Sequence, residues 1–220
     1  MEHIARAGAL PALSDTVRKT LTNTFITVGG MLGITAAASL LAQNLKPSMG
    51  LSIGTLVMSL VLIFAIQAYR KSGFGLVLLA LFSGIMGVAM GPVIGAHMQV
   101  PNGGATLGLA FGATALATFS CAAYAITTRR DFSRWYAFLF GGLVVLLAMS
   151  IIGLFVSTPA LHLAIGAFGS LLFIGWMLFD IGRVVSGEET SYISAALSIY
   201  LDILNFFLSV LRLLGFLPRD

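Results

Sequence analysis

Two aspartates lie inside long apolar runs of this 220-residue chain, and their type and placement could support chemistry. Asp180 ends the run that begins at Leu171, and Asp202 lies within the run from Ile193 to Leu214. A carboxylate at mid-depth in a membrane costs about 2.5–3.5 kcal/mol on insertion scales, so such residues usually face the interior of a helix bundle. We therefore treat Asp180 and Asp202 as one candidate site. The other acids lie in tails or connectors: Glu2, Asp15, Asp131, Glu188, Glu189 and Asp220.

The chemistry expected of such a pair is proton sensing. Two carboxylates at short range cannot both ionise easily, so the pair is joined when it shares one proton and repels when both groups are charged. When both are ionised, their oxygens also suit a hard cation such as Ca²⁺. Two structural alternatives stay open. Asp180 pairs with Arg183 on the same helix face, or Asp202 is a buried, protonated acid that bonds Asn205 or a hydroxyl.

The composition is typical of a membrane protein. Charged residues make up 9% of the chain, well below the roughly 25% of soluble domains. The apolar residues come in runs of about 20, the length that crosses a bilayer as a helix. The net charge of +4 is carried by short connectors, which indicates topology and not nucleic-acid binding. The chain has no HExxH or CxxC motif and no phosphate-binding glycine loop, so we expect neither an enzyme nor a bound cofactor.

Seven apolar runs predict an all-α membrane protein, a bundle of seven transmembrane helices. A polar N-terminal tail, residues 1–19, comes first, with Ser14 as a candidate cap for the first helix. Residues 20–220 then form the transmembrane domain. The predicted spans are 21–42, 51–69, 74–96, 105–126, 135–156, 160 to past 180, and 193–215.

The basic residues predict the orientation. One side holds the tail and every second connector, with Arg6, Arg18, Lys19, Arg70, Lys71, Arg129, Arg130, Arg134 and Arg183. The other side holds Lys46 and Arg219, with Arg212 near the same end of the last span. The positive-inside rule then gives a cytoplasmic N-terminus and an external C-terminus. Asp180 falls toward the cytoplasmic side, and Asp202 lies deeper, about ten residues into an antiparallel neighbouring helix.

Glycine recurs at every fourth position in two neighbouring spans. The third span holds Gly87, Gly91 and Gly95, and the fourth begins with Gly104, Gly108 and Gly112. Small residues at this spacing let two membrane helices approach closely, so we expect both strips to be packing surfaces. Pro92 lies within the first strip and is expected to bend the helix, because it removes a backbone hydrogen bond. A hinge in the third span is the alternative.

Several motifs, in order and at consistent spacing, resemble the Bax inhibitor-1 family. They begin with GVAMGPVI at residues 87–94 and AFGATA at residues 110–115, followed by Phe119. Residues 128–131, 159–163 and 187–193 and the final residues 215–220 are similar to the bacterial YccA-like branch of that family. The resemblance covers almost the whole chain.

This resemblance implies a seven-helix bundle with the last helix at its centre, in the inner membrane of a bacterium. In relatives of the YetJ type an aspartate pair on the last two helices is the pH sensor of a calcium leak, and Asp180 and Asp202 match that pair. The chain keeps both acids, which favours a pH-sensitive calcium or cation leak. The YccA-like branch implies an alternative: a modulator and binding partner of the membrane protease FtsH, with the N-terminal tail as the segment that the protease engages.

Overall fold

Seven long α-helices make up the computed structural model, which describes residues 13–46, 48–156 and 158–215. They are α1 (Asp15–Ala42), α2 (Met49–Ala68), α3 (Phe74–Met98), α4 (Gly103–Thr128), α5 (Tyr136–Phe155), α6 (Pro159–Ser186) and α7 (Tyr192–Gly215), with a short 3₁₀ helix, η1 (Ser133–Trp135), before α5. Each is long and apolar enough to span a membrane, with η1 counted as part of the α5 span. The predicted all-α, seven-span fold is confirmed.

Short polar residues set the beginnings of three helices. The hydroxyl of Ser14 accepts a hydrogen bond from the backbone N–H of Val17, at 3.3 Å, as predicted for an N-cap. Ser48 and Thr158 cap α2 and α6 in the same way. Because Ser14 caps the helix, α1 begins at Asp15, six residues before the predicted start of the first span. Most of residues 1–19, the predicted tail, lie outside the described ranges.

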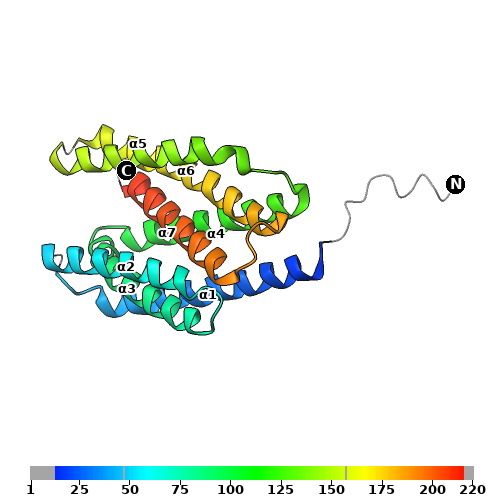
Figure 1. The fold of residues 1–220 in the computed structure, drawn as a ribbon. Helices are drawn as coiled ribbons and strands as arrows, with labels where there is room; N and C mark the ends of the chain where they lie inside the picture. Colours follow the sequence, from blue (N-terminus) through cyan, green and yellow to red (C-terminus); the bar gives the residue numbers. More distant parts are fainter. Residues whose placement is uncertain (1–12, 47, 157, 216–220) are drawn as a thin grey trace.

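The last helix is central, as the family resemblance implied. Figure 1 shows α7 crossing between the α5–α6 pair and the group formed by α1, α2 and α3. It packs against α1, α2, α3, α4 and α6. Most of its side chains are buried, including Tyr200, Asp202 and Phe207. Helices that follow one another run in opposite directions, so α1 begins and α7 ends at opposite ends of the bundle.

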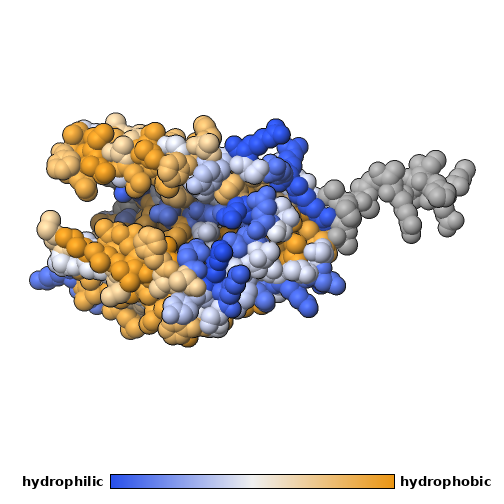
Figure 2. All heavy atoms as spheres, in the orientation of Figure 1, coloured by the Kyte–Doolittle hydropathy of each residue, from blue (hydrophilic) through white to orange (hydrophobic). Residues whose placement is uncertain are grey.

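The surface divides into an apolar band and a polar end. Hydrophobic residues cover most of the helical face in Figure 2, whereas hydrophilic residues gather at the end where α1 begins. Large apolar side chains such as Phe64 of α2 and Leu154 of α5 are exposed. An exposed apolar band of this extent is the lipid-facing surface of a membrane protein.

The two glycine strips differ in what they face. A Cβ on Gly87 or Gly91 would come within 2.6 Å of α1 backbone atoms, and one on Gly95 would overlap the carbonyl oxygen of Gln43. The first strip is therefore the contact between α3 and α1. The prediction that the α4 strip packs against a neighbouring helix was wrong. Cβ atoms on Gly104, Gly108 and Gly112 would meet nothing within 4 Å among the described residues. The α4 helix packs through another face, which includes Leu107, Ala110 and Thr114.

Pro92 lies in the interior of α3, which continues to Met98. Its neighbours Gly91 and Gly95 pack on the C-terminal end of α1. The hinge in α3 stays a prediction.

Candidate functional site

Asp180 and Asp202 lie on consecutive helices that pack side by side. Asp180 is six residues before the end of α6, and Asp202 is ten residues after the start of α7. The connector between the helices turns at Gly187, whose φ of +81° lies in the left-handed region that suits glycine. Both aspartates are buried, with exposed fractions of 9% and 6%.

The two carboxyl groups are neighbours in the bundle, and each lies within interaction range of the other. The Oδ2 atom of Asp202 is buried and has no hydrogen-bond partner within the described part of the chain. Leaving a buried carboxylate oxygen without a hydrogen-bond partner is costly.

Arg183 lies in the last turn of α6, one turn closer to the α6–α7 connector than Asp180. Its Nη1 is 3.7 Å from Oδ1 of Asp180, so the ion pair considered from the sequence is present. The same guanidinium is 3.8 Å from Oε2 of Glu189 and 4.0 Å from Oε2 of Glu188. Because three carboxylates share one guanidinium, Arg183 links Asp180 to the α6–α7 connector and does not belong to Asp180 alone.

Asn205 lies away from the carboxyl pair. Its Nδ2 donates to the carbonyl oxygen of Leu201, at 2.8 Å, which is a bond within α7. Its side chain lines a cavity of about 320 Å³ between α5, α6 and α7, together with Ser150, Ser209 and Arg212. The structure therefore does not bring Asn205 to Asp202, although both are on α7.

A hydroxyl cluster holds α7 in place next to the pair. Tyr200, two residues before Asp202, is fully buried, and its hydroxyl bonds Oγ1 of Thr35 in α1. Thr35 in turn donates to the carbonyl oxygen of Ser83 in α3, at 3.0 Å. These bonds fix α7 against α1 and α3, so a movement at the pair is expected to involve α6 more than α7.

The beginning of α7 is tied to α2. The Ser191 hydroxyl donates to the carbonyl oxygen of Arg70, at 2.9 Å, and the Ser194 hydroxyl donates to Oε1 of Gln67, at 2.8 Å. On the other side of the pair lies Cys121 of α4, whose thiol is within electrostatic range of Asp202. The residues that the structure describes contain no group of three or more His, Cys, Asp or Glu that could hold a metal.

Sequence reasoning did not find Glu188, Glu189, Tyr200 or Thr35 as neighbours of the pair. The sequence did contain one indication for the two glutamates. They directly follow Gly187, the C-cap of α6, so the turn at that glycine brings them near Arg183 in the last turn of the helix. No local signal marks Thr35, because its partner Tyr200 is far away in the sequence.

The comparisons with known proteins agree with this architecture. The family model described as "Inhibitor of apoptosis-promoting Bax1" matches residues 17–218. The chain is 39% identical to an uncharacterized membrane protein of Vibrio cholerae over 98% of this chain and 96% of the relative. It is 36% identical to a protein of Escherichia coli strain K12 named "Modulator of FtsH protease YccA", over 92% of each chain. An uncharacterized protein of Pseudomonas aeruginosa is 35% identical over 87% of this chain and 88% of its own. This chain belongs to the Bax inhibitor-1 family of membrane proteins.

Proposed function

We propose that this protein is a proton-regulated cation leak of the bacterial inner membrane, with calcium as the ion that passes. The observation that carries the proposal is that Asp180 and Asp202 are buried within interaction range of each other, on two helices that pack together. One shared proton holds α6 against α7 in the closed state. Loss of that proton leaves two adjacent negative charges, which separate the helices and offer oxygen ligands to a cation.

The size of the repulsion is sufficient for a switch. Two unit charges about 4 Å apart interact by about 4 kcal/mol at an effective dielectric constant of about 20. That energy changes a two-state equilibrium about a thousandfold. The other charged or titratable groups facing the pair are Arg183, Glu188 and Glu189 at the α6–α7 connector and Cys121 on α4. Arg183 attracts the ionised Asp180, so it moderates the repulsion and does not remove it.

A stripe of polar residues on α7 supports a route from the pair to the other end of the bundle. Asp202, Asn205, Ser209 and Arg212 follow one another at spacings of three, four and three residues, so they share one face of the helix. The last three line the cavity between α5, α6 and α7. The cavity offers polar groups to a cation that moves from the carboxyl pair toward that end of the bundle. Apolar side chains at the same positions would oppose its passage.

Calcium flux into proteoliposomes, followed from acid to alkaline pH, tests the proposal. The parent is expected to conduct more as the pH rises, whereas Asp180→Asn and Asp202→Asn, which remove the repulsion, are expected to lose most of this dependence. Glu188→Gln is the matched control, because it removes a half-exposed acid outside the pair. A parent without flux at any pH rejects the leak. Equal pH profiles in all four proteins reject the role of the pair alone.

A second function is favoured by the similarity to the Escherichia coli protein named as a modulator of FtsH protease. In this proposal the chain binds a membrane protease of that kind and slows its action on other substrates. Deletion of residues 2–12 keeps the Ser14 cap of α1, so the bundle is expected to fold while co-purification with the protease is reduced. Unchanged co-purification and unchanged substrate lifetimes would count against the tail as the binding segment.

A further inference from the structure

A cleft opens between α4 and α5 at the end of the bundle that carries most of the basic residues. Both helices pack on α6, but in the described part of the chain they do not pack on each other. A pocket of about 420 Å³ lies at this cleft, lined by α4, the connector with η1, and Leu178 of α6 as its floor. Its deepest α4 residue, Ser120, is eight residues before the end of the helix, or about 12 Å into the span. The pocket therefore reaches from headgroup depth into the region of the acyl chains.

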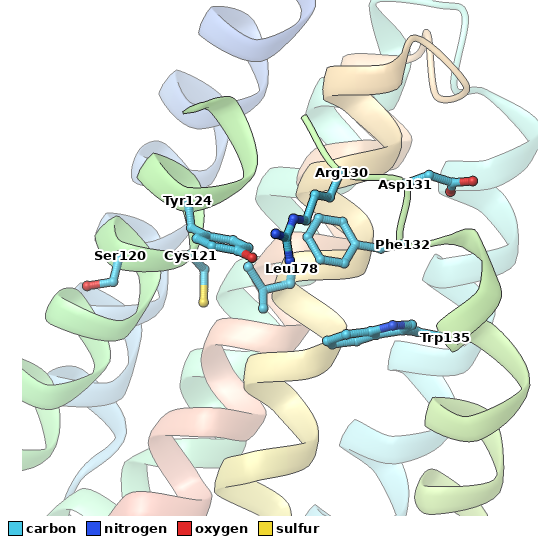
Figure 3. A pocket seen from close by; sticks show the side chains of 8 residues that line it. All are labelled: Ser120, Cys121, Tyr124, Arg130, Asp131, Phe132, Trp135 and Leu178. Carbon is cyan, nitrogen blue, oxygen red and sulfur yellow. The ribbon is translucent and has the colours of Figure 1, made fainter. Parts of the chain in front are cut away.

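One arginine points into this pocket. Figure 3 shows the Arg130 guanidinium directed inward between Tyr124 and Phe132, above Leu178, with Trp135 at the side. Aromatic residues of this kind are typical of the membrane interface. The wall formed by the connector is held firmly: Phe132 is buried against Gly182 of α6, and its ring meets that of Trp135 edge to face at 5.4 Å. A Cβ on Gly182 would come within 2.6 Å of that ring.

Arg130 has no acidic partner among the described residues. The nearest acid in sequence, Asp131, also lines the pocket, but its carboxylate points away from the Arg130 guanidinium. Its Oδ1 accepts a hydrogen bond from the backbone N–H of Ser133, at 2.8 Å. Hydrogen bonds from the Ser133 side chain and backbone hold the pKa of Asp131 below its usual value, so this carboxylate stays charged and engaged elsewhere. The pocket thus presents a positive charge above an apolar floor.

The geometry points to a binding site for the headgroup phosphate of an anionic phospholipid. The Arg130 guanidinium pairs with the phosphate, while the acyl chain leaves along Leu178 between α4 and α5. The connector carries Arg129, Arg130 and Arg134 against the single acid Asp131, so its charge favours an anionic lipid over one with a cationic headgroup. Neither Asp180 nor Asp202 lines this pocket, although its lining residue Cys121 lies within electrostatic range of Asp202. The inference does not depend on the leak.

Native mass spectrometry of protein from nanodiscs tests the site. The nanodiscs contain phosphatidylcholine and phosphatidylglycerol, and the measurement is the phosphatidylglycerol retained after detergent washing. Arg130→Gln is expected to lower the retained lipid about fivefold, the effect of one basic residue at a membrane surface. Leu178→Trp fills the floor of the pocket and keeps the charge, and it is expected to lower retention as well. Arg134→Gln is the matched control, because Arg134 belongs to the same connector but does not line the pocket.

Circular dichroism melting checks that each variant is folded before lipid is measured. Retention equal to the parent in Arg130→Gln or in Leu178→Trp would overturn the site. An equal loss in Arg134→Gln would overturn it too, because it would reveal a general surface attraction. Excess inorganic phosphate is added to the parent in a further arm. Displacement of the lipid by phosphate would assign the pocket to free phosphate and overturn the lipid site.

Discussion

At the scale of residues, the buried side chains of Tyr200 and Asp202 differ in their hydrogen bonding, although they are only two positions apart on α7. The Tyr200 hydroxyl is bonded to Thr35, whereas Oδ2 of Asp202 is buried and has no hydrogen-bond partner among the residues that the structure describes. An unsatisfied buried polar atom costs about 1–3 kcal/mol. A structural role alone would be served better by an apolar residue at position 202. In the proposed leak, this oxygen belongs to a group that gains and loses a proton.

We expect Tyr200→Phe to lower the thermal stability of the bundle. The change removes the hydroxyl that joins α7 to Thr35, at a cost of about 1 kcal/mol for one buried hydrogen bond. Thr35 keeps its bond to Ser83, so no donor is left without an acceptor. Thermal unfolding in detergent, followed by circular dichroism, measures the effect. Tyr136→Phe, at an exposed position, is the control and is expected to melt like the parent.

The sequence predicted the residues of the site better than their partners. Asp180 and Asp202 could be found because a carboxylate inside an apolar span is unusual, and Arg183 because it is three residues from Asp180 on the same helix. Asn205 was placed next to Asp202 by the same spacing, yet its amide donates to Leu201. Helical spacing puts two residues on one face, but the rotamer decides which neighbour a side chain meets.

At the scale of elements, the two glycine strips have the same spacing and different surroundings. The α3 strip, Gly87, Gly91 and Gly95, touches the backbone of α1, whereas the α4 strip, Gly104, Gly108 and Gly112, faces open space. The spacing predicts a flat face, but only the arrangement of the other helices decides whether a neighbour covers it. The apolar runs could therefore predict seven helices, and the family resemblance implied the central one, but neither predicted every pair of helices that packs.

We expect Gly91→Ala to separate α1 from α3. Its new Cβ would lie 2.6 Å from the backbone carbonyl carbon of Ala42, which cannot move as a side chain can. Overpacking of this kind typically costs about 1–3 kcal/mol. The matched control is Gly108→Ala, which meets open space and gains helix propensity, so its stability is expected to equal or exceed that of the parent. Equal melting temperatures for the two variants would contradict the assignment of the strips.

The polar stripe of α7 leads to a prediction for Arg212, which lines the cavity between α5, α6 and α7. In the proposed leak, this positive charge opposes a cation that moves between that cavity and Asp202. Arg212→Gln is expected to raise calcium flux severalfold in proteoliposomes and to keep the pH dependence, because the carboxyl pair is intact. Lys46→Gln, in the connector at the same end of the bundle, is the control and is expected to conduct like the parent. Lower flux in Arg212→Gln would contradict this route.

At the scale of the whole molecule, hydrophilic residues gather mainly at one end of the bundle, where α1 begins, as Figure 2 shows. The polar end carries the α4–α5 and α6–α7 connectors, with Arg130 and the Arg183 cluster. Both proposed functions place this end in the cytoplasm, and the lipid site then faces the inner leaflet. The distribution of basic residues predicts that orientation, since arginine and lysine in short connectors are retained on the cytoplasmic side.

The orientation can be measured with reporters fused at two positions. Alkaline phosphatase, which is active only outside the cytoplasm, is expected to be active after Asp220 and inactive when inserted after Ser72, in the α2–α3 connector. Green fluorescent protein, which fluoresces when it folds in the cytoplasm, is expected to give the reverse pattern. Inverted results at both positions would contradict the topology. They would also place the tail away from the cytoplasmic domain of a protease and expose the Arg130 pocket to the outer leaflet, so this measurement constrains all three proposals together.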